Sequence, residues 1–218
     1  MKPKHNNLLT NVRITNPRRK KQIEEFVDNN HSVMHQYYEI IEQELSDAKL
    51  EQKMKRFIDK DPDFYDPYTV LTEIYDNQGK ETEAFQIITQ GFTRAMKRIV
   101  DFKGQFPQEL PWGWLENRHL IRIIYQQAHD CWSLGDTDSA LYLFRNLFHS
   151  NPHDNIGARN DILAIRMGLT PDYNDQFITK DTLPGCIDGH LSSQWFDKNS
   201  KKFTDEFDWW WKIVEPDE

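Results

Sequence analysis

Hydrophobic side chains recur at intervals of three and four residues along most of this chain, which is the pattern of amphipathic helices. The longest regular stripe lies in residues 80–102, and further helices are expected at about 117–134, 137–148 and 155–167. Alternation of apolar and polar residues, which is typical of strands, is not sustained between turn signals. The pattern therefore predicts an all-α fold built from antiparallel helix pairs with short turns.

The N-terminal part gives weaker signals. Residues 1–15 are expected to form a flexible basic arm. Asn16-Pro17 indicates a helix start, because Asn is a favoured N-cap and Pro fits the first helical position. The apolar face of that helix would be formed by Ile23, Phe26 and Val27.

Turn glycines, small residues and prolines recur in a common frame. Ala84 follows Gly79 by five residues, Ala140 follows Gly135 by five, and Pro152 follows Gly135 by seventeen. Glycine permits a tight turn, alanine allows two helices to approach closely, and proline ends the second helix. A 34-residue period of this kind indicates tetratricopeptide (TPR) repeats, which stack to bury their open apolar faces.

This frame divides the chain into a TPR-like right-handed stack of helix pairs at 16–169 and an irregular C-terminal extension at 170–218. The repeat units would be 31–64, which is degenerate, 65–98 and 121–154. A loop at about 104–116 would be inserted between units. The aromatic end of the extension, FDWWWKIV (207–214), is expected to cap the last helix pair. Its alternatives are self-association in a homo-oligomer and occupation of the protein's own groove.

Several segments resemble an uncharacterised family of bacterial TPR proteins. The most specific are PWGWLENR (111–118) and NPHDNIGAR (151–159), and the resemblance covers about residues 55–211. It implies a TPR fold and a soluble bacterial protein, and it transfers no catalytic residues.

Charge and cysteine content narrow the function classes. The net charge is −8, although residues 1–21 hold seven Lys and Arg side chains and no Asp or Glu. The remaining body is strongly acidic and disfavours nucleic-acid binding. Two cysteines make no disulfide framework, and no apolar run reaches membrane-spanning length. A cytoplasmic protein that does not bind membranes is expected.

The repeat frame also assigns candidate binding residues, because the first helix of each TPR unit lines the concave surface. The early unit contributes acidic and polar positions, namely Asp66, Thr69, Glu73 and Asp76. The later positions are basic and aromatic, namely Arg122, Tyr125, His129, Trp132, Arg159 and Arg166. The arginines could hold a peptide carboxylate through paired hydrogen bonds, with the aromatic rings supplying contact area. Alternatively, these arginines pair with nearby Asp or Glu side chains.

Two tryptophans flank a glycine in the predicted loop. Trp112 and Trp114 could form an aromatic pocket, although such pairs more often fasten a loop onto the helices behind it. Glu116 or Asn117 would cap the following helix.

A zinc site is the weakest alternative. His129 and Cys131 could combine with Cys186 and His190, but Cys131 falls on a core position of the repeat, and the chain has no CxxC or HExxH. The sequence also lacks a glycine-flanked nucleophile turn and a phosphate-binding glycine loop. It therefore predicts a non-catalytic protein- or peptide-binding scaffold without a cofactor. The alternative is a structural homo-oligomer joined through the aromatic tail.

Overall fold

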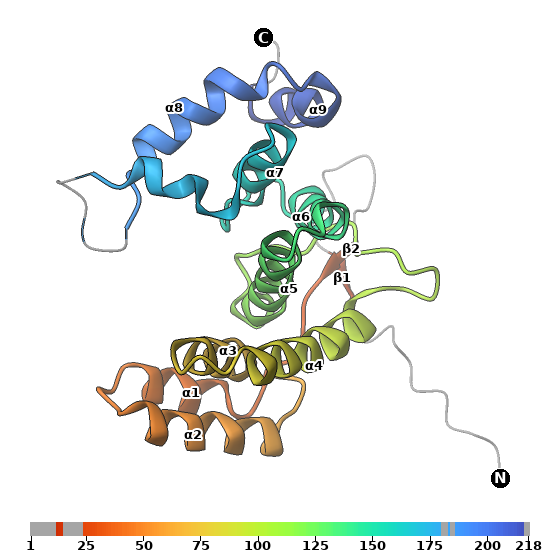
Figure 1. Ribbon diagram of the computed structural model, residues 1–218. Helices are drawn as coiled ribbons and strands as arrows, with labels where there is room; N and C mark the ends of the chain where they lie inside the picture. Colours follow the sequence, from red (N-terminus) through yellow and green to blue (C-terminus); the bar gives the residue numbers. More distant parts are fainter. Residues whose placement is uncertain (1–11, 15–23, 180–182, 184–185, 216–218) are drawn as a thin grey trace. The chain divides into compact units, whose positions relative to one another are not determined.

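The computed structural model describes residues 12–14, 24–179, 183 and 186–215, and helices dominate it (Figure 1). The α-helices are α1 (Met34–Ile41), α2 (Asp47–Lys60), α3 (Asp66–Asn77), α4 (Glu81–Ile99), α5 (Leu115–Ser133), α6 (Thr137–Ser150), α7 (Ala158–Arg166), α8 (Gly189–Ser200) and α9 (Thr204–Val214). A 3-10 helix, η2, spans Pro171–Phe177. The all-α class predicted from the periodicity is confirmed.

A short two-stranded ribbon departs from the sequence prediction. β1 (Val12–Ile14) pairs antiparallel with β2 (Glu24–Phe26), with Val12 opposite Phe26. β1 falls in the arm expected to be flexible, and Phe26 belongs to a strand instead of the expected helix face. The proposed helix start at Asn16-Pro17 lies outside the described residues.

A long-range contact explains why Phe26 lies in a strand, although the local spacing of apolar residues predicted a helix there. The backbone N–H of Phe26 donates to the carbonyl of Glu109 at 2.8 Å. The extended conformation of this segment is therefore supported by a partner more than eighty residues away, which no local spacing rule detects.

The chain forms two compact units, which we describe separately. The N-terminal unit comprises Met1–Gln127 with His149–Asn151, and the C-terminal unit comprises Ala128–Phe148 with Pro152–Glu218. Their boundary falls inside α5.

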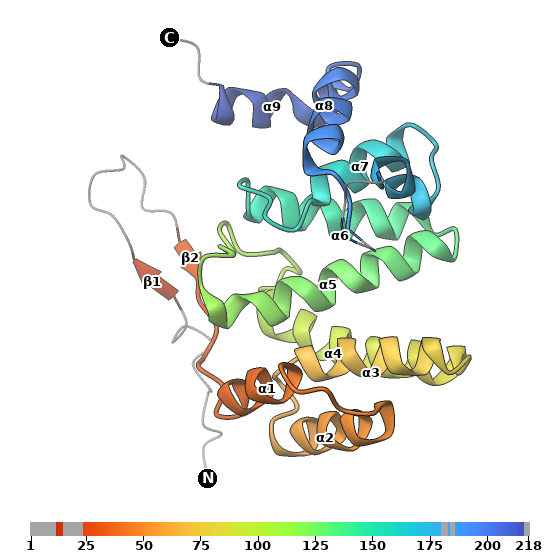
Figure 2. The ribbon, with the colours of Figure 1, turned by 90° about the vertical axis from the view of Figure 1, so that its left-hand side faces the viewer.

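Helix pairs form the N-terminal unit. α2 packs on α3, and α3 packs on α4. Gly79 makes the α3–α4 turn with φ +68°, a left-handed conformation, and Ala84 is buried beyond it. Both ribbon views place the α3–α4 pair between α1–α2 and the first part of α5 (Figure 2). The backbone of α4 approaches its neighbours so closely that a Cβ on Gly91 would lie 2.6 Å from Ile123 Cδ1.

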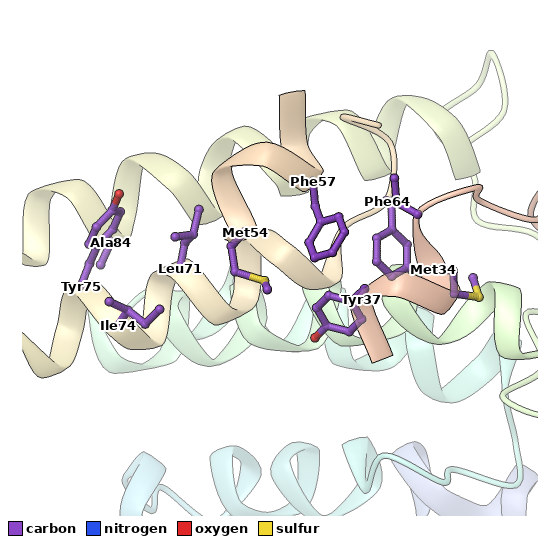
Figure 3. Close-up of a cluster of buried hydrophobic side chains, with 10 residues drawn as sticks. Met34, Tyr37, Met54, Phe57, Phe64, Leu71, Ile74, Tyr75 and Ala84 are labelled. Carbon is purple, nitrogen blue, oxygen red and sulfur yellow. The ribbon is translucent and has the colours of Figure 1, made fainter. Parts of the chain in front are cut away.

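One hydrophobic cluster joins the first helix pairs of this unit (Figure 3). It includes Met34, Tyr37, Met54, Phe57, Phe64, Leu71, Ile74, Tyr75 and Ala84. Apart from Phe64, which lies between α2 and α3, these residues lie on the inward faces of their helices, so the stripes seen in the sequence become the buried faces. At ~1.5–3 kcal/mol for each large side chain, their burial is a major source of the unit's stability.

The C-terminal unit contains a second glycine turn of the same kind. Gly135 has φ +84° between α5 and α6, and Ala140 is buried beyond it. The N-cap residue of α7 is Gly157, and the carboxylate of Asp154 accepts the first backbone N–H groups of the helix, from Ala158 at 2.8 Å and Arg159 at 3.0 Å.

The aromatic tail packs within the same unit. Phe207 is completely buried, Trp210 is 8% exposed, and the indole N–H of Trp210 donates to the carbonyl of Pro152 at 2.8 Å. Phe148 and Phe196 contact this tail with ring centroids about 5–6 Å apart. The tail therefore covers apolar surface at the end of α6, as expected for a cap.

Candidate functional site

A groove of about 390 Å³ lies between α3 and the first part of α5 in the N-terminal unit. Its walls come from Thr69, Val70, Thr72, Glu73, Asp76 and Asn77 on α3, and from Arg122, Tyr125 and Gln126 on α5. The wall residues recur at intervals of three and four, so each helix presents one continuous face to the groove.

The structure brings together most of the N-terminal positions that the repeat frame assigned to the concave surface. Thr69, Glu73 and Asp76 line one wall, and Arg122 and Tyr125 line the other. Because the two sets come from helices far apart in sequence, their meeting depends on how α3 and α5 pack.

Arg122 is already engaged by the chain itself. Its Nε and Nη2 donate to the Asp66 carboxylate at 2.8 and 2.5 Å, and Nη2 also donates to the Tyr38 hydroxyl at 3.1 Å. Burial opposes the charge on Arg122, but hydrogen bonds to Asp66 outweigh it, so the pKa of this guanidinium is raised. The expected role of Arg122 in holding a peptide carboxylate loses its basis, because Asp66 occupies its paired donors.

The opposite wall carries unbalanced negative charge. Glu73 and Asp76 are exposed and one helical turn apart, and within the described ranges neither carboxylate has a hydrogen-bond or ion-pair partner. With Arg122 balanced by Asp66, these two groups set the charge of the groove. Its polar character is therefore acidic.

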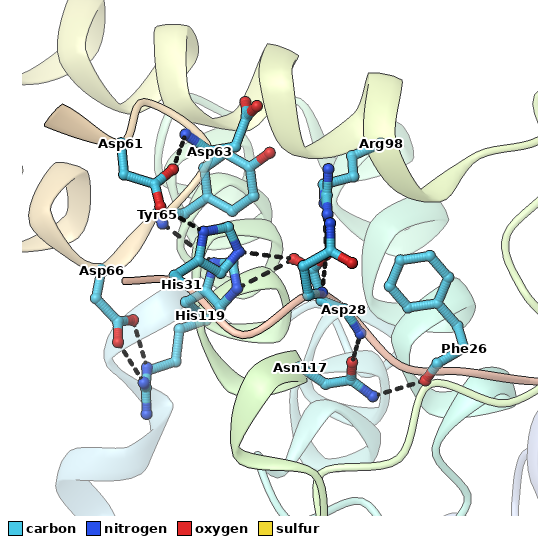
Figure 4. A network of polar contacts seen from close by, with 12 residues as sticks. Phe26, Asp28, His31, Asp61, Asp63, Tyr65, Asp66, Arg98, Asn117 and His119 are labelled. Carbon is cyan, nitrogen blue, oxygen red and sulfur yellow. Dashed lines mark hydrogen bonds and ion pairs between the residues drawn. The ribbon is translucent and has the colours of Figure 1, made fainter. Parts of the chain in front are cut away.

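A buried charged network, which no sequence pattern indicated, joins the start of α5 to the segment before α1 (Figure 4). Its centre is Asp28, between β2 and α1, with 4% exposure. The Asp28 carboxylate lies 3.3 Å from His31 Nε2 and 3.2 Å from His119 Nε2, and it accepts a 2.5 Å hydrogen bond from Arg98 Nε. The backbone N–H of Asp28 donates to Asn117 Oδ1 at 2.9 Å.

The pKa values of the two histidines in this network shift in opposite directions. His31 places Nε2 towards Asp28 and Nδ1 towards Asp61 at 2.8 Å, so both ring nitrogens face carboxylates. Burial opposes protonation, but the two carboxylates outweigh it and raise the pKa of His31. Burial dominates at His119 and lowers its pKa, so that ring is neutral.

The tautomer of His119 follows from its backbone contact. The N–H of Tyr65 donates to His119 Nδ1 at 3.1 Å, so Nδ1 accepts and the proton resides on Nε2, facing Asp28. Burial would raise the pKa of Asp28, but hydrogen bonds from His119, His31 and Arg98 hold it well below its usual range. The network thus contains an ionised carboxylate surrounded by donors.

The contacts of this arrangement argue against a bound metal ion. Asp28, His31 and His119 offer ligand atoms within 4.8 Å of one another, a spacing a metal ion could use. However, a ligating histidine must present an unprotonated nitrogen. His119 Nε2 is protonated, His31 lies between two carboxylates, and the Arg98 cation bonds directly to Asp28. These features favour a structural charge network.

The network positions one wall of the groove. Asn117 and His119 stand on α5 upstream of Arg122 and Tyr125, and they tie α5 to the segment at Asp28 and to Tyr65 at the start of α3. Asn117 lies inside α5 and also donates to the carbonyl of Phe26 at 2.8 Å, so the expected role of Asn117 as a helix cap is wrong.

The remaining predicted groove residues belong to the C-terminal unit. Trp132 is 4% exposed and packs against Phe144 and Tyr173, so its expected role as a contact surface for a ligand is wrong. His129 is half-buried, and its Nε2 lies 3.5 Å from the Asp161 carboxylate. These side chains hold α5, α6 and η2 together.

Arg159 and Arg166 are fixed by internal carboxylates. Arg159 Nη1 donates to Asp154 at 3.0 Å, and its guanidinium lies over the rings of Phe196 and Trp210. Arg166 donates to Glu206 at 2.7 Å and pairs with Asp205 at 2.9 Å in α9.

Arg145 adds a paired contact to Glu206 at 2.8 and 2.6 Å. These contacts realise the alternative of internal salt bridges and attach the tail, so they correct the expectation that Arg159 and Arg166 hold a ligand.

Trp112 and Trp114 each contact another part of the N-terminal unit. The indole of Trp114 donates to Glu25 at 2.8 Å, and the guanidinium groups of Arg118 and Arg122 lie over Trp112. Both tryptophans are half-buried, and neither lines the α3–α5 groove. These contacts indicate that the two tryptophans fasten the loop onto the helices and do not form an aromatic pocket.

The suggested zinc ligands do not gather in the part of the chain that the structure describes. Cys131 is half-buried, whereas Cys186 is exposed. His190 Nε2 lies 2.9 Å from Gln194. His129, Cys131, Cys186 and His190 form no cluster with metal-ligand spacing there.

Comparisons with family models, curated proteins and solved structures found no match to this chain. Among the described residues, none of the helices combines the length and apolarity that a membrane crossing needs.

Proposed function

We propose that this chain is a non-catalytic TPR-type binding module whose α3–α5 groove holds an extended segment of a partner protein. The observation that carries this proposal is the coincidence of the groove with Thr69, Glu73, Asp76, Arg122 and Tyr125. These are the positions at which TPR units present side chains to a ligand. The two glycine turns at Gly79 and Gly135, each followed by a buried alanine, support the TPR assignment.

The chemistry of the groove suits binding of a partner segment. Its lining combines carboxylates, amides and hydroxyl groups with the Arg122 guanidinium, and several of these groups can hydrogen-bond an extended chain. Its volume falls within the ~300–1,000 Å³ typical of ligand sites. That space accommodates a few side chains of an extended peptide.

Blocking the groove tests the proposal. Peptides that bind the full chain are selected from a random library, and their affinity is measured by calorimetry. Thr69→Trp places a bulky neutral side chain in the α3 wall, and Thr82→Trp makes the same change at an exposed position of α4. We expect Thr69→Trp to abolish binding of the selected peptides and Thr82→Trp to leave it unchanged. Equal affinity for both variants would overturn the proposal.

A further inference from the structure

We propose that the segment held in the α3–α5 groove is cationic and presents two Lys or Arg side chains to Glu73 and Asp76. This inference rests on the proposed function and specifies the chemistry of the partner. It reverses the expectation of a carboxylate ligand, because the arginine in the groove is paired internally and the carboxylates are not.

Charge complementarity carries the argument. Asp66 forms a paired hydrogen bond with Arg122 and is 1% exposed, so it balances Arg122 from below the groove surface. Glu73 and Asp76 are the remaining ionised groups of the lining, and both face solvent. A guanidinium or ammonium group is the complement that gains most from them, while a carboxylate would be repelled.

The spacing of the two carboxylates suits an extended chain. Glu73 and Asp76 are three residues apart on one helix face, which places their Cβ atoms ~5–6 Å apart. In an extended peptide, alternate side chains point the same way and are ~6.6 Å apart. Basic residues at alternate positions therefore match the two carboxylates. Tyr125, on the opposite wall, can pack against the aliphatic part of one of them.

The test uses three peptides of equal length that carry Lys, Ala or Glu at two alternate positions. We expect the Lys peptide to bind the full chain most tightly and to weaken as salt is raised from ~0.05 to ~0.5 M, because exposed ion pairs are screened. The double variant Glu73→Gln with Asp76→Asn should lower the affinity for the Lys peptide about tenfold. Two exposed ion pairs of ~0.2–1 kcal/mol each would be lost, which corresponds to roughly a tenfold change in the dissociation constant.

A matched control removes the same charge elsewhere in the unit. Glu44→Gln with Asp59→Asn alters exposed residues outside the groove, and it should change the affinity by less than about twofold. An equal loss in both double variants would overturn the inference, as would tighter binding of the Ala or Glu peptide. If the Ala or Glu peptide binds more tightly than the Lys peptide, and Thr69→Trp abolishes that binding, the groove is still the binding site. The proposed function then stands, but the cationic specificity does not. If Thr69→Trp blocks no peptide, the proposed function itself fails.

Discussion

Replacement of Asp28 by Asn tests the network that holds α5 in place. Asp28 is 4% exposed, and its carboxylate faces two cations, Arg98 and the doubly hydrogen-bonded His31. Asn keeps the volume and can accept a hydrogen bond but removes the negative charge, so Arg98 loses its buried counter-ion and His31 keeps only Asp61. Breaking a buried pair by removing one partner costs ~3–5 kcal/mol. Since Asn retains part of the hydrogen bonding, we expect Asp28→Asn to destabilise the protein by about 3 kcal/mol.

The loss is a large share of the ~5–15 kcal/mol that keeps a typical domain folded. Urea denaturation near pH 6, followed by circular dichroism, measures it, and hydrogen exchange of residues 115–127 shows whether α5 loosens first. Asp59→Asn, on the exposed face of α2, is the control and should stay within ~0.5 kcal/mol of the parent. A loss below ~1 kcal/mol for Asp28→Asn would refute the view that this carboxylate anchors the unit.

Three further predictions concern separate parts of the structure. The pKa of His31 is raised in the folded state, so its stabilisation is complete below its unfolded pKa of about 6.5 and is lost as the pH rises through the folded pKa. In urea titrations between pH 5 and 9, the stability difference between the parent and His31→Gln should therefore shrink with rising pH; a growing difference would contradict the assignment. Gly91→Ala would bring a Cβ within 2.6 Å of Ile123 and 2.7 Å of Tyr68, so despite the better helix propensity of Ala we expect a net loss of about 1–2 kcal/mol on thermal denaturation. A gain in stability there would mean that the helices are not so tightly packed. Arg166→Glu would place a third carboxylate beside α9, and limited proteolysis should then release the tail faster than in Arg166→Gln; equal rates would show that charge at this position does not hold the tail.

Local rules identified the helical hairpins correctly. Gly79 and Gly135 both adopt the left-handed conformation that ends a helix, and the small residues five positions later are buried. The expected helix at 137–148 corresponds to α6, and the stripe at 80–102 to α4, except that Phe102 lies beyond the helix and is 94% exposed. These features depend on residues close in sequence, which is why periodicity and turn chemistry can detect them.

Contacts between distant residues could not be predicted in this way. His119 and Asn117 contact Asp28, which is about ninety residues away in the sequence. No spacing pattern of histidine or asparagine predicts a contact of this kind. The only available signal was a run of polar residues on an otherwise apolar helix, which suits a solvated face equally well. Internal pairing of the arginines was left open as an alternative, but the partners of Arg166 could not be named, because they lie in a tail some forty residues further on.

The repeat frame assigned acidic positions to α3 and a basic position to α5, and several of these residues line the groove. The frame counts charged side chains without knowing which of them are paired. Asp66 and Arg122 were assigned to opposite ends of a charge gradient, yet they neutralise each other. In the proposed binding mode, the charge left unpaired after folding selects the ligand.

Hydrogen exchange in the presence of the Lys peptide is the most direct test of the claim that the α3–α5 groove binds a partner segment. At saturating peptide, protection should appear in residues 69–77 of α3 and 122–126 of α5, which line the groove, and it should vanish in Thr69→Trp. Protection confined to α7–α9, or none at all with bound peptide, would contradict the assignment of the α3–α5 groove as the binding site.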